Sequence, residues 1–109
     1  MKHLISFEDF KKLDLRVGRI TKAEKVAGSE KLVKLSVNIG QEELLVIAGI
    51  ALQYQPEDLA GKEIIIVVNL EPRKLMGLES QGMLLAADGE EGPVLIVPGR
   101  EVLPGTIVR

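Results

Sequence analysis

The segment that decides the fold is Lys31-Leu-Val-Lys-Leu-Ser-Val-Asn38, in which apolar and polar side chains alternate. Successive side chains of a β-strand point to opposite faces. Val33, Leu35 and Val37 would therefore point inward, while Lys34 and the other polar members point outward. This period of two predicts a strand with one buried and one exposed face.

Segments on both sides of it also have the character of strands. Leu15 and Val17 alternate with Arg16, so the apolar residues before Gly18 have odd numbers, whereas Ile20 after it has an even number. A β-bulge at Gly18 would explain this change and would place Arg16 and Arg19 on the same outer face. The other predicted strands are Leu44–Ile50, Ile64–Val68, which is β-branched throughout and so expected to be covered on both sides, and Met83–Ala87.

The segments between and around these strands predict turns and two short helices. Ser6-Phe-Glu-Asp9 has the spacing of a helix-capping box, which predicts a helix from about Phe7 to Leu13. Pro56–Leu59 predicts a helical turn that Gly61 stops. The remaining expectations are a turn at Gly40–Glu42, a loop over Glu71–Glu79, a hairpin turn at Asp88–Gly92 with a returning strand at Val94–Val97, and a last short strand at Thr106–Val108.

Five main strands with closely spaced turns predict an all-β protein, in the form of a small closed barrel. A β-sandwich is the alternative. We expect one domain over residues 1–109, divided into a helix (1–13), a barrel (14–88) and a C-terminal hairpin extension (89–109). An isolated hairpin is not stable in water, so the extension must cover either the barrel or a second subunit.

Composition limits the class of protein. The 109 residues are 46% apolar and contain no cysteine, which excludes disulfides and thiolate zinc sites. No apolar run is long enough for a transmembrane helix, and the N-terminus becomes polar too early for a signal peptide. We therefore expect no membrane association and a cytoplasmic location.

The charges are distributed unevenly, although the formal net charge is only −2. From Lys11 to Lys34 there are eight basic residues and three acidic ones. From Leu35 to Pro72 the single base Lys62 is outnumbered by six acids. This asymmetry indicates either a basic face that meets a polyanion or an ordinary solvated surface.

The sequence contains no set of residues suited to catalysis. His3 is the only histidine and lies near the N-terminus, and there is no glycine-rich phosphate loop or metal-ligand spacing. We therefore predict no enzyme activity, no metal and no cofactor. Aromatic residues are limited to Phe7, Phe10 and Tyr54, so a nucleic-acid binder of this composition would contact phosphates and sugars rather than stack bases.

Six motifs together resemble a known family. The chain is similar to the tRNA-binding domain appended to methionyl-tRNA synthetases, and to free-standing tRNA-binding proteins and the endothelial monocyte-activating polypeptide domain. The resemblance runs from about Phe7 to the C-terminus, and its specificity comes from the order and spacing of the motifs. They are Asp14-Leu-Arg-Val-Gly-Arg-Ile20, Ala48-Gly-Ile50, Tyr54-Gln-Pro-Glu57, Gly61-Lys62, Asn69-Leu-Glu-Pro-Arg-Lys74 and Ser80-Gln-Gly-Met-Leu-Leu-Ala86.

The resemblance implies a five-stranded barrel of the oligonucleotide/oligosaccharide-binding (OB) type, with a short N-terminal helix and the C-terminal hairpin extension. It implies a homodimer whose interface is formed by the N-terminal helix and the C-terminal extension. It also implies largely sequence-independent binding to the outer corner of tRNA. The chain would then raise the tRNA affinity of the catalytic part of a methionyl-tRNA synthetase, as its C-terminal domain, as its β subunit or as a free-standing protein.

The expected tRNA-binding residues come partly from this resemblance and partly from the strand pattern. By position, Asn69 and Ser80 resemble the polar contact residues of the family, with Met83 beside them. A turn residue, a loop cap and a core residue are the respective structural alternatives. The exposed loop adds Arg73 and Lys74, and the outward strand faces add Arg16, Arg19 and Lys34, whose alternative is a solvated face.

The chain departs from the family in one place and leaves two other functions open. Many relatives have a histidine-containing stretch where this chain has Val26-Ala-Gly-Ser-Glu30, so contacts made by that histidine are absent. A secretion-type protein chaperone resembles the same barrel dimer; the stretch Ser80–Met83 favours tRNA over this alternative. A protein-interaction or cytokine-like module is the third possibility, for which no motif was found.

Overall fold

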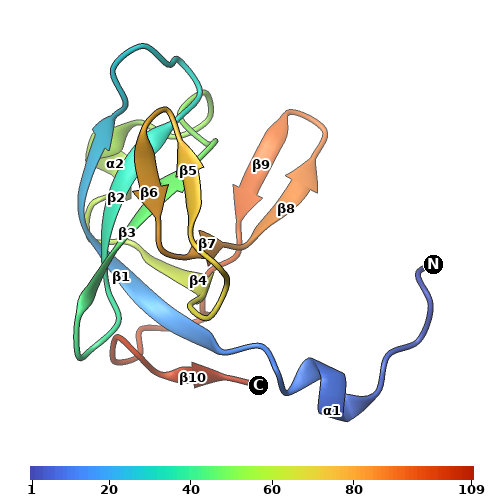
Figure 1. Cartoon of the computed structure of the whole chain (residues 1–109). Helices are drawn as coiled ribbons and strands as arrows, with labels where there is room; N and C mark the ends of the chain where they lie inside the picture. The colour runs from blue at the N-terminus through green and yellow to red at the C-terminus, as the bar shows by residue number, and fades with distance from the viewer.

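Strands account for most of the regular structure in the computed structural model, which describes residues 1–109 (Figure 1). Neither of its two helices, of four residues each, has the length or apolar character that a bilayer span requires. In chain order the elements are α1 (Phe7–Phe10), β1 (Leu15–Lys25), β2 (Val33–Asn38), β3 (Glu43–Ala48), α2 (Pro56–Leu59), β4 (Glu63–Val67), β5 (Arg73–Leu75), β6 (Leu78–Ser80), β7 (Met83–Leu84), β8 (Ala86–Gly89), β9 (Gly92–Leu95) and β10 (Ile107–Val108).

The main sheet runs in the order β3-β2-β1-β4-β7, and every neighbouring pair is antiparallel. The short β10 pairs with the beginning of β1. The sheet curls until its free edge at β3 meets the segment after β6, where the Gln81 N–H donates to the Leu45 carbonyl at 2.7 Å. The result is a nearly closed five-stranded barrel, so the predicted all-β, OB-like fold is confirmed.

The core of the barrel is formed by 13 buried residues, most of them from β2, β3 and β4. Burial along β2 alternates as its sequence predicts, with Val33, Leu35 and Val37 fully inside. The strand β4 is buried at four consecutive positions, Ile64 to Val67, as its β-branched run predicts.

The predicted bulge at Gly18 is wrong. The register between β1 and β4 is continuous from Leu15↔Val67 to Arg19↔Glu63, and the irregularity lies instead between β1 and β2, after Ile20. Because the alternation of faces is unbroken, Arg16 and Arg19 point to opposite faces of β1, not to one face. Gly18 is explained by close packing, since a Cβ at this position would collide with the side chain of Val37.

Three other predicted elements differ from the structure. The N-terminal helix ends at Phe10 rather than Leu13, although Ser6 caps it by accepting the Asp9 N–H at 3.0 Å. The predicted loop Glu71–Glu79 contains the hairpin of β5 and β6. The predicted fifth strand is divided at Leu85: β7 pairs with β4, whereas β8 leaves the barrel and pairs with β9.

The C-terminal part of the chain contacts the barrel at several points. The hydroxyl of Tyr54 accepts the Leu95 N–H at 3.0 Å, which holds the β8–β9 hairpin close to α2. Farther along, the Val17 N–H donates to the Thr106 carbonyl at 2.8 Å, next to the β1–β10 pairing. Figure 1 shows this hairpin standing beside the barrel and the N-terminal arm, residues 1–13, extending away from it.

Candidate nucleic-acid interface

A groove with an apolar floor lies beside the barrel, between β3 and the β5–β6 hairpin. Its volume is about 310 Å³, and it is open to solvent. Seven of its ten lining residues are hydrophobic, and the only charged ones are Lys31 and Arg73. The lining residues are Lys31, Leu32, Ile47, Ala48, Gly49, Ile50, Arg73, Leu75, Met83 and Leu84.

The β5–β6 hairpin forms one wall of this groove. Its two-residue turn consists of Met76 at φ 52° and Gly77 at φ 80°, with Leu75 paired to Leu78 on either side. Two consecutive positive φ angles fit the tight hairpin turn that follows the natural twist of strands. The end of the Met76 side chain lies against Gly28, where an added Cβ would meet it at 3.4 Å. The tip of the hairpin therefore packs against the loop between β1 and β2.

Lys31 and Arg73 provide free positive charge at the groove. The stem of Lys31 passes closely over Gly49, where an added Cβ would lie 3.0 Å from the lysine Cε. Neither Lys31 nor Arg73 has a carboxylate oxygen within 4.0 Å, and neither does Lys74, the next residue on the hairpin. These cations can therefore accept an anionic partner without first losing an ion pair.

Ser80 closes the barrel beside the groove. Its hydroxyl accepts the Ile47 N–H at 3.0 Å and donates to the Gly82 carbonyl at 3.0 Å, and its residue is only 6% exposed. The neighbouring Gln81 uses its side-chain oxygen to accept the Leu45 N–H at 2.7 Å. The side chains of Ser80 and Gln81 thus accept hydrogen bonds from backbone N–H groups at the edge of β3, where a neighbouring strand would otherwise provide the acceptors. Met83, by contrast, is 42% exposed and lines the groove.

Lys34 lies on the same side of the molecule as the groove. It is the direct cross-strand neighbour of Ile47, which lines the groove, and of Glu24. Its Nζ lies 3.0 Å from a Glu24 carboxylate oxygen. The hydrogen bond and the charge of Lys34, with a smaller contribution from the charge of Lys22, lower the pKa of Glu24 below its ordinary value.

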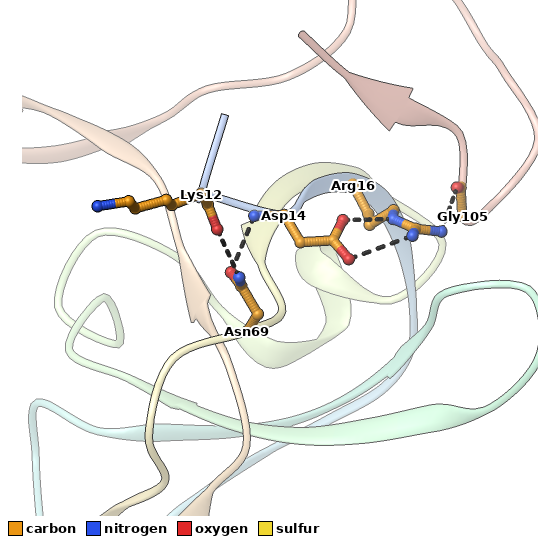
Figure 2. Close-up of polar contacts among 5 residues, drawn as sticks. All are labelled: Lys12, Asp14, Arg16, Asn69 and Gly105. Carbon is orange, nitrogen blue, oxygen red and sulfur yellow. Dashed lines mark hydrogen bonds and ion pairs between the residues drawn. The ribbon is translucent and has the colours of Figure 1, made fainter. Parts of the chain in front are cut away.

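The structure places Arg16 and Asn69 away from the groove, where the N-terminal arm joins the barrel (Figure 2). The carboxylate of Asp14 accepts from Arg16 at 2.6 and 3.2 Å, which raises the pKa of this arginine. The Asn69 amide binds the backbone of Lys12 and Asp14.

Arg19 is placed differently again. It contacts a carboxylate oxygen of Glu63 at 3.3 Å and of Glu101 at 2.7 Å. The eight expected residues therefore do not form one surface. Lys34, Arg73, Ser80 and Met83 are at or next to the groove, with Lys74 on its hairpin wall.

Sequence reasoning missed Lys31, Leu75 and Met76 as parts of this interface. Lys31 was counted in the basic stretch, but nothing local distinguishes it from its neighbours. The signal that could have been used is Gly77, because a glycine inside a presumed loop also permits a tight turn. No group of three or more histidine, cysteine or acidic side chains is arranged to hold a metal ion.

Comparison with known proteins gives consistent relatives. The model of the family described as "Putative tRNA binding domain" matches residues 15–107. The methionine–tRNA ligase of Archaeoglobus fulgidus is 52% identical over 107 residues, which are 98% of this chain but 16% of that ligase. The chain therefore spans about one sixth of the length of that relative.

Two solved structures have the same fold over their whole length. A protein related to methionyl-tRNA synthetase from Pyrococcus horikoshii has a TM-score of 0.92 at 45% identity, over 99% of this chain and 100% of that one. A chaperone, CsaA from Bacillus anthracis, has a TM-score of 0.88 at 33% identity, over 98% and 100%. Since the family model matches far more than half of the sequence, the chain belongs to the tRNA-binding domain family and is related to a domain of methionyl-tRNA synthetases.

Proposed function

We propose that this chain binds tRNA along the groove between β3 and the β5–β6 hairpin, largely independently of sequence. One observation carries the proposal: unpaired Lys31 and Arg73 flank an apolar groove in a member of a tRNA-binding family. OB barrels bind nucleic acids on this face, between the loops that flank it. Without an aromatic residue in the groove, phosphate and sugar contacts would supply most of the affinity.

The expected residues take different parts in this proposal. Arg73, Lys74 and Met83 contact RNA directly, together with Lys31. Lys34 joins them when phosphate replaces Glu24 as its partner. Ser80 acts by holding the groove in shape. Arg16 and Arg19, each bound to acidic side chains, contact RNA only by exchanging those carboxylates for phosphates.

The relatives of the domain support a proposal for its setting. We propose that it raises the tRNA affinity of the catalytic part of a methionyl-tRNA synthetase in the cytoplasm, as the C-terminal domain, as the β subunit or as a separate protein. Ligases related to it are about six times longer, and the proposed role is binding rather than catalysis.

We also propose that two copies associate. Apolar side chains are exposed on the N-terminal arm, on the β8–β9 hairpin and on β10, and a second copy would remove them from water. A groove of about 640 Å³ separates the arm from β10 and is lined by apolar residues of both. After the terminal Met1, the most exposed apolar residues of these three segments are Leu4 (94%), Phe7 (72%), Ile5 (67%), Ile107 (54%) and Val94 (52%).

The test measures tRNA binding as a function of salt for the wild type and for a K31E/R73E variant. Each phosphate neutralised adds about 0.7–0.9 to the slope of log affinity against log salt. Loss of two contacts should therefore reduce the slope by about 1.4–1.8 and weaken binding strongly. The matched control is K62E/R100E, which makes the same change in net charge at a different surface.

The two variants distinguish tRNA binding at the groove from a general effect of net charge on binding. Strong loss in K31E/R73E with little change in K62E/R100E would support the groove. Equal losses would show that only net charge matters and would contradict the site. Binding by the wild type that is absent or insensitive to salt would contradict the tRNA function itself.

The structural likeness to CsaA chaperones supports a second candidate, binding of unfolded polypeptides. The apolar floor of the groove could hold peptide side chains as well as nucleotides. Competition distinguishes the two: an unfolded polypeptide that displaces tRNA only at large excess favours RNA as the ligand. Salt-insensitive binding of the polypeptide, with no binding of tRNA, would favour the chaperone.

A further inference from the structure

Asn69 uses both ends of its side-chain amide to hold the N-terminal arm. The side-chain oxygen accepts the Asp14 N–H at 2.8 Å, and the side-chain nitrogen donates to the Lys12 carbonyl at 2.7 Å. These two bonds bracket Leu13, at the point where the arm enters β1 (Figure 2). The Val68 N–H adds a third bond, to the Asp14 carbonyl at 3.0 Å. Asn69 can therefore be called a latch between the arm and the end of β4.

The latch is the only polar tether of the arm. Every other hydrogen bond and ion pair of residues 1–13 lies within the arm itself. No residue of α1 is buried. A helix of four residues has little stability of its own, so its direction depends on where it is attached.

The latch also connects to the C-terminal segment. The Asp14 carboxylate holds Arg16, whose terminal nitrogen reaches the Gly105 carbonyl at 3.4 Å. Gly105 immediately precedes the segment that pairs with β1 through β10. One network thus fixes the bases of both parts of the chain that line the 640 Å³ groove.

The chemistry of the arm fits a protein surface better than an RNA. Its two lysines in the helical region are paired internally, Lys12 with Asp9 at 3.0 Å and Lys11 with Glu8 at 3.7 Å. Lys2, near the start of the arm, has no acidic partner, but the unpartnered side chains from Leu4 to Phe10 are apolar, with Phe7 72% exposed. A helix with internally paired charges and exposed apolar residues matches another apolar surface, such as the same arm and β10 of a second copy.

We propose that Asn69 is a positioning residue for self-association, and that it acts by directing the N-terminal arm toward a second copy rather than by contacting tRNA. This inference rests on the homodimer proposed above. It assigns to the amide a role that accounts for both of its hydrogen bonds.

The experiment follows the arm and the dimer separately in the full-length chain. Because the chain contains no cysteine, I5C introduces a single site for a nitroxide spin label on the arm. N69A should make this label more mobile and raise the dimer dissociation constant about tenfold or more, since each dimer loses two latches. N69D, which keeps an acceptor for Asp14 but loses the donor to Lys12, should change both in the same direction.

The matched control is N38A. The Asn38 side chain also bonds a backbone N–H, that of Gly40 at 2.8 Å, but within its own turn. N38A should change neither the label nor the dimer. A double-mutant cycle tests whether Asn69 acts through the arm. In an F7S background, in which the arm no longer packs against a second copy, N69A should have little further effect on the dimer dissociation constant. A purely structural role of Asn69 would give the same effect in both backgrounds.

The possible outcomes distinguish failure of the role inferred for Asn69 from failure of the proposed homodimer. A wild type that remains monomeric at all concentrations contradicts the homodimer, and the inference with it. A dimeric wild type in which N69A leaves the label and the dissociation constant unchanged overturns the inference alone. Loss of tRNA binding in N69A with an unchanged arm and dimer would assign Asn69 to direct RNA contact, and would also overturn it.

Discussion

The hydroxyl of Ser80 satisfies a buried backbone donor. In S80A the Ile47 N–H would lose its partner inside the protein, which costs about 1–3 kcal/mol of unfolding free energy. Urea denaturation would measure this loss. The control is S36A, because the Ser36 hydroxyl makes no hydrogen bond, and its effect should be within about 0.5 kcal/mol. Weakened tRNA binding in S80A at unchanged stability would instead indicate a direct contact.

Glu24 restrains a cation beside the groove. In E24Q the carboxylate that holds Lys34 is removed, so the lysine becomes free to bind phosphate. We expect stronger tRNA binding and a salt slope increased by about 0.7–0.9. A fluorescence titration at several salt concentrations would measure both. Unchanged affinity and slope would show that Lys34 lies outside the RNA path.

The same pair predicts a pH effect. Lys34 holds the pKa of Glu24 below its ordinary value. The ion pair is therefore intact at any pH above the pKa that Glu24 has in the unfolded chain. Its contribution to stability is lost as the pH falls through the lowered folded-state pKa. NMR titration of the Glu24 carboxyl should therefore show a midpoint below the ordinary value of a glutamate. A midpoint at the ordinary value would contradict the pair in solution.

At the level of elements, the β5–β6 hairpin depends on its turn. Gly77 has φ 80° and open space around it, so G77A would add backbone strain without a collision. We expect a cost of about 1–2 kcal/mol, concentrated in the hairpin. Faster amide exchange in Arg73–Ser80 than in β2 would measure it. G99A is the matched control, because Gly99 has equally open space but no positive φ.

The elements that sequence predicted well are those whose pattern is local. The alternation of β2 and the β-branched run of β4 each determine burial by themselves. The β5–β6 hairpin was not found because its strands have three residues each and its turn is Met76-Gly77 rather than Asn-Gly or Asp-Gly. The bulge was predicted at Gly18 because the apolar positions change there from odd to even numbers. The change has another cause: β1 is buried on both faces, since Leu15, Val17 and Ile20 are all inside.

The candidate site was harder to predict because its contacts are distant in sequence. The resemblance directed attention to Asn69 and Ser80, but their hydrogen-bond partners in Lys12, Asp14 and Ile47 lie 33 to 57 residues away in the chain. Lys31 became part of the groove only through Gly49 and the hairpin, which no local pattern shows.

Across the whole molecule, the count of basic residues overstated the free positive charge. Five of the eight bases between Lys11 and Lys34 form ion pairs, which leaves Lys22, Lys25 and Lys31. The positive surface available to RNA is therefore smaller than the asymmetry suggested, and it depends strongly on the hairpin, which adds Arg73 and Lys74.

Self-association should make the thermal stability of the whole molecule depend on its concentration. A homodimer unfolds at a higher temperature as the protein concentration rises, because mass action favours the associated native state. F7S removes an exposed apolar side chain from the arm, so it should weaken the dimer and reduce this dependence. It should leave the melting temperature at low concentration unchanged, because no residue of α1 is buried in the barrel.

Differential scanning fluorimetry over a hundredfold range of concentration would measure the effect, with sedimentation velocity to assign the species. K2S is the control, since it changes the same arm without removing apolar surface. A wild type with a constant melting temperature, or an F7S variant that keeps the concentration dependence, would exclude the arm from the interface. In that case the exposed apolar side chains of the C-terminal part, among them Val94, Leu103 and Ile107, would still offer a surface through which two copies could associate.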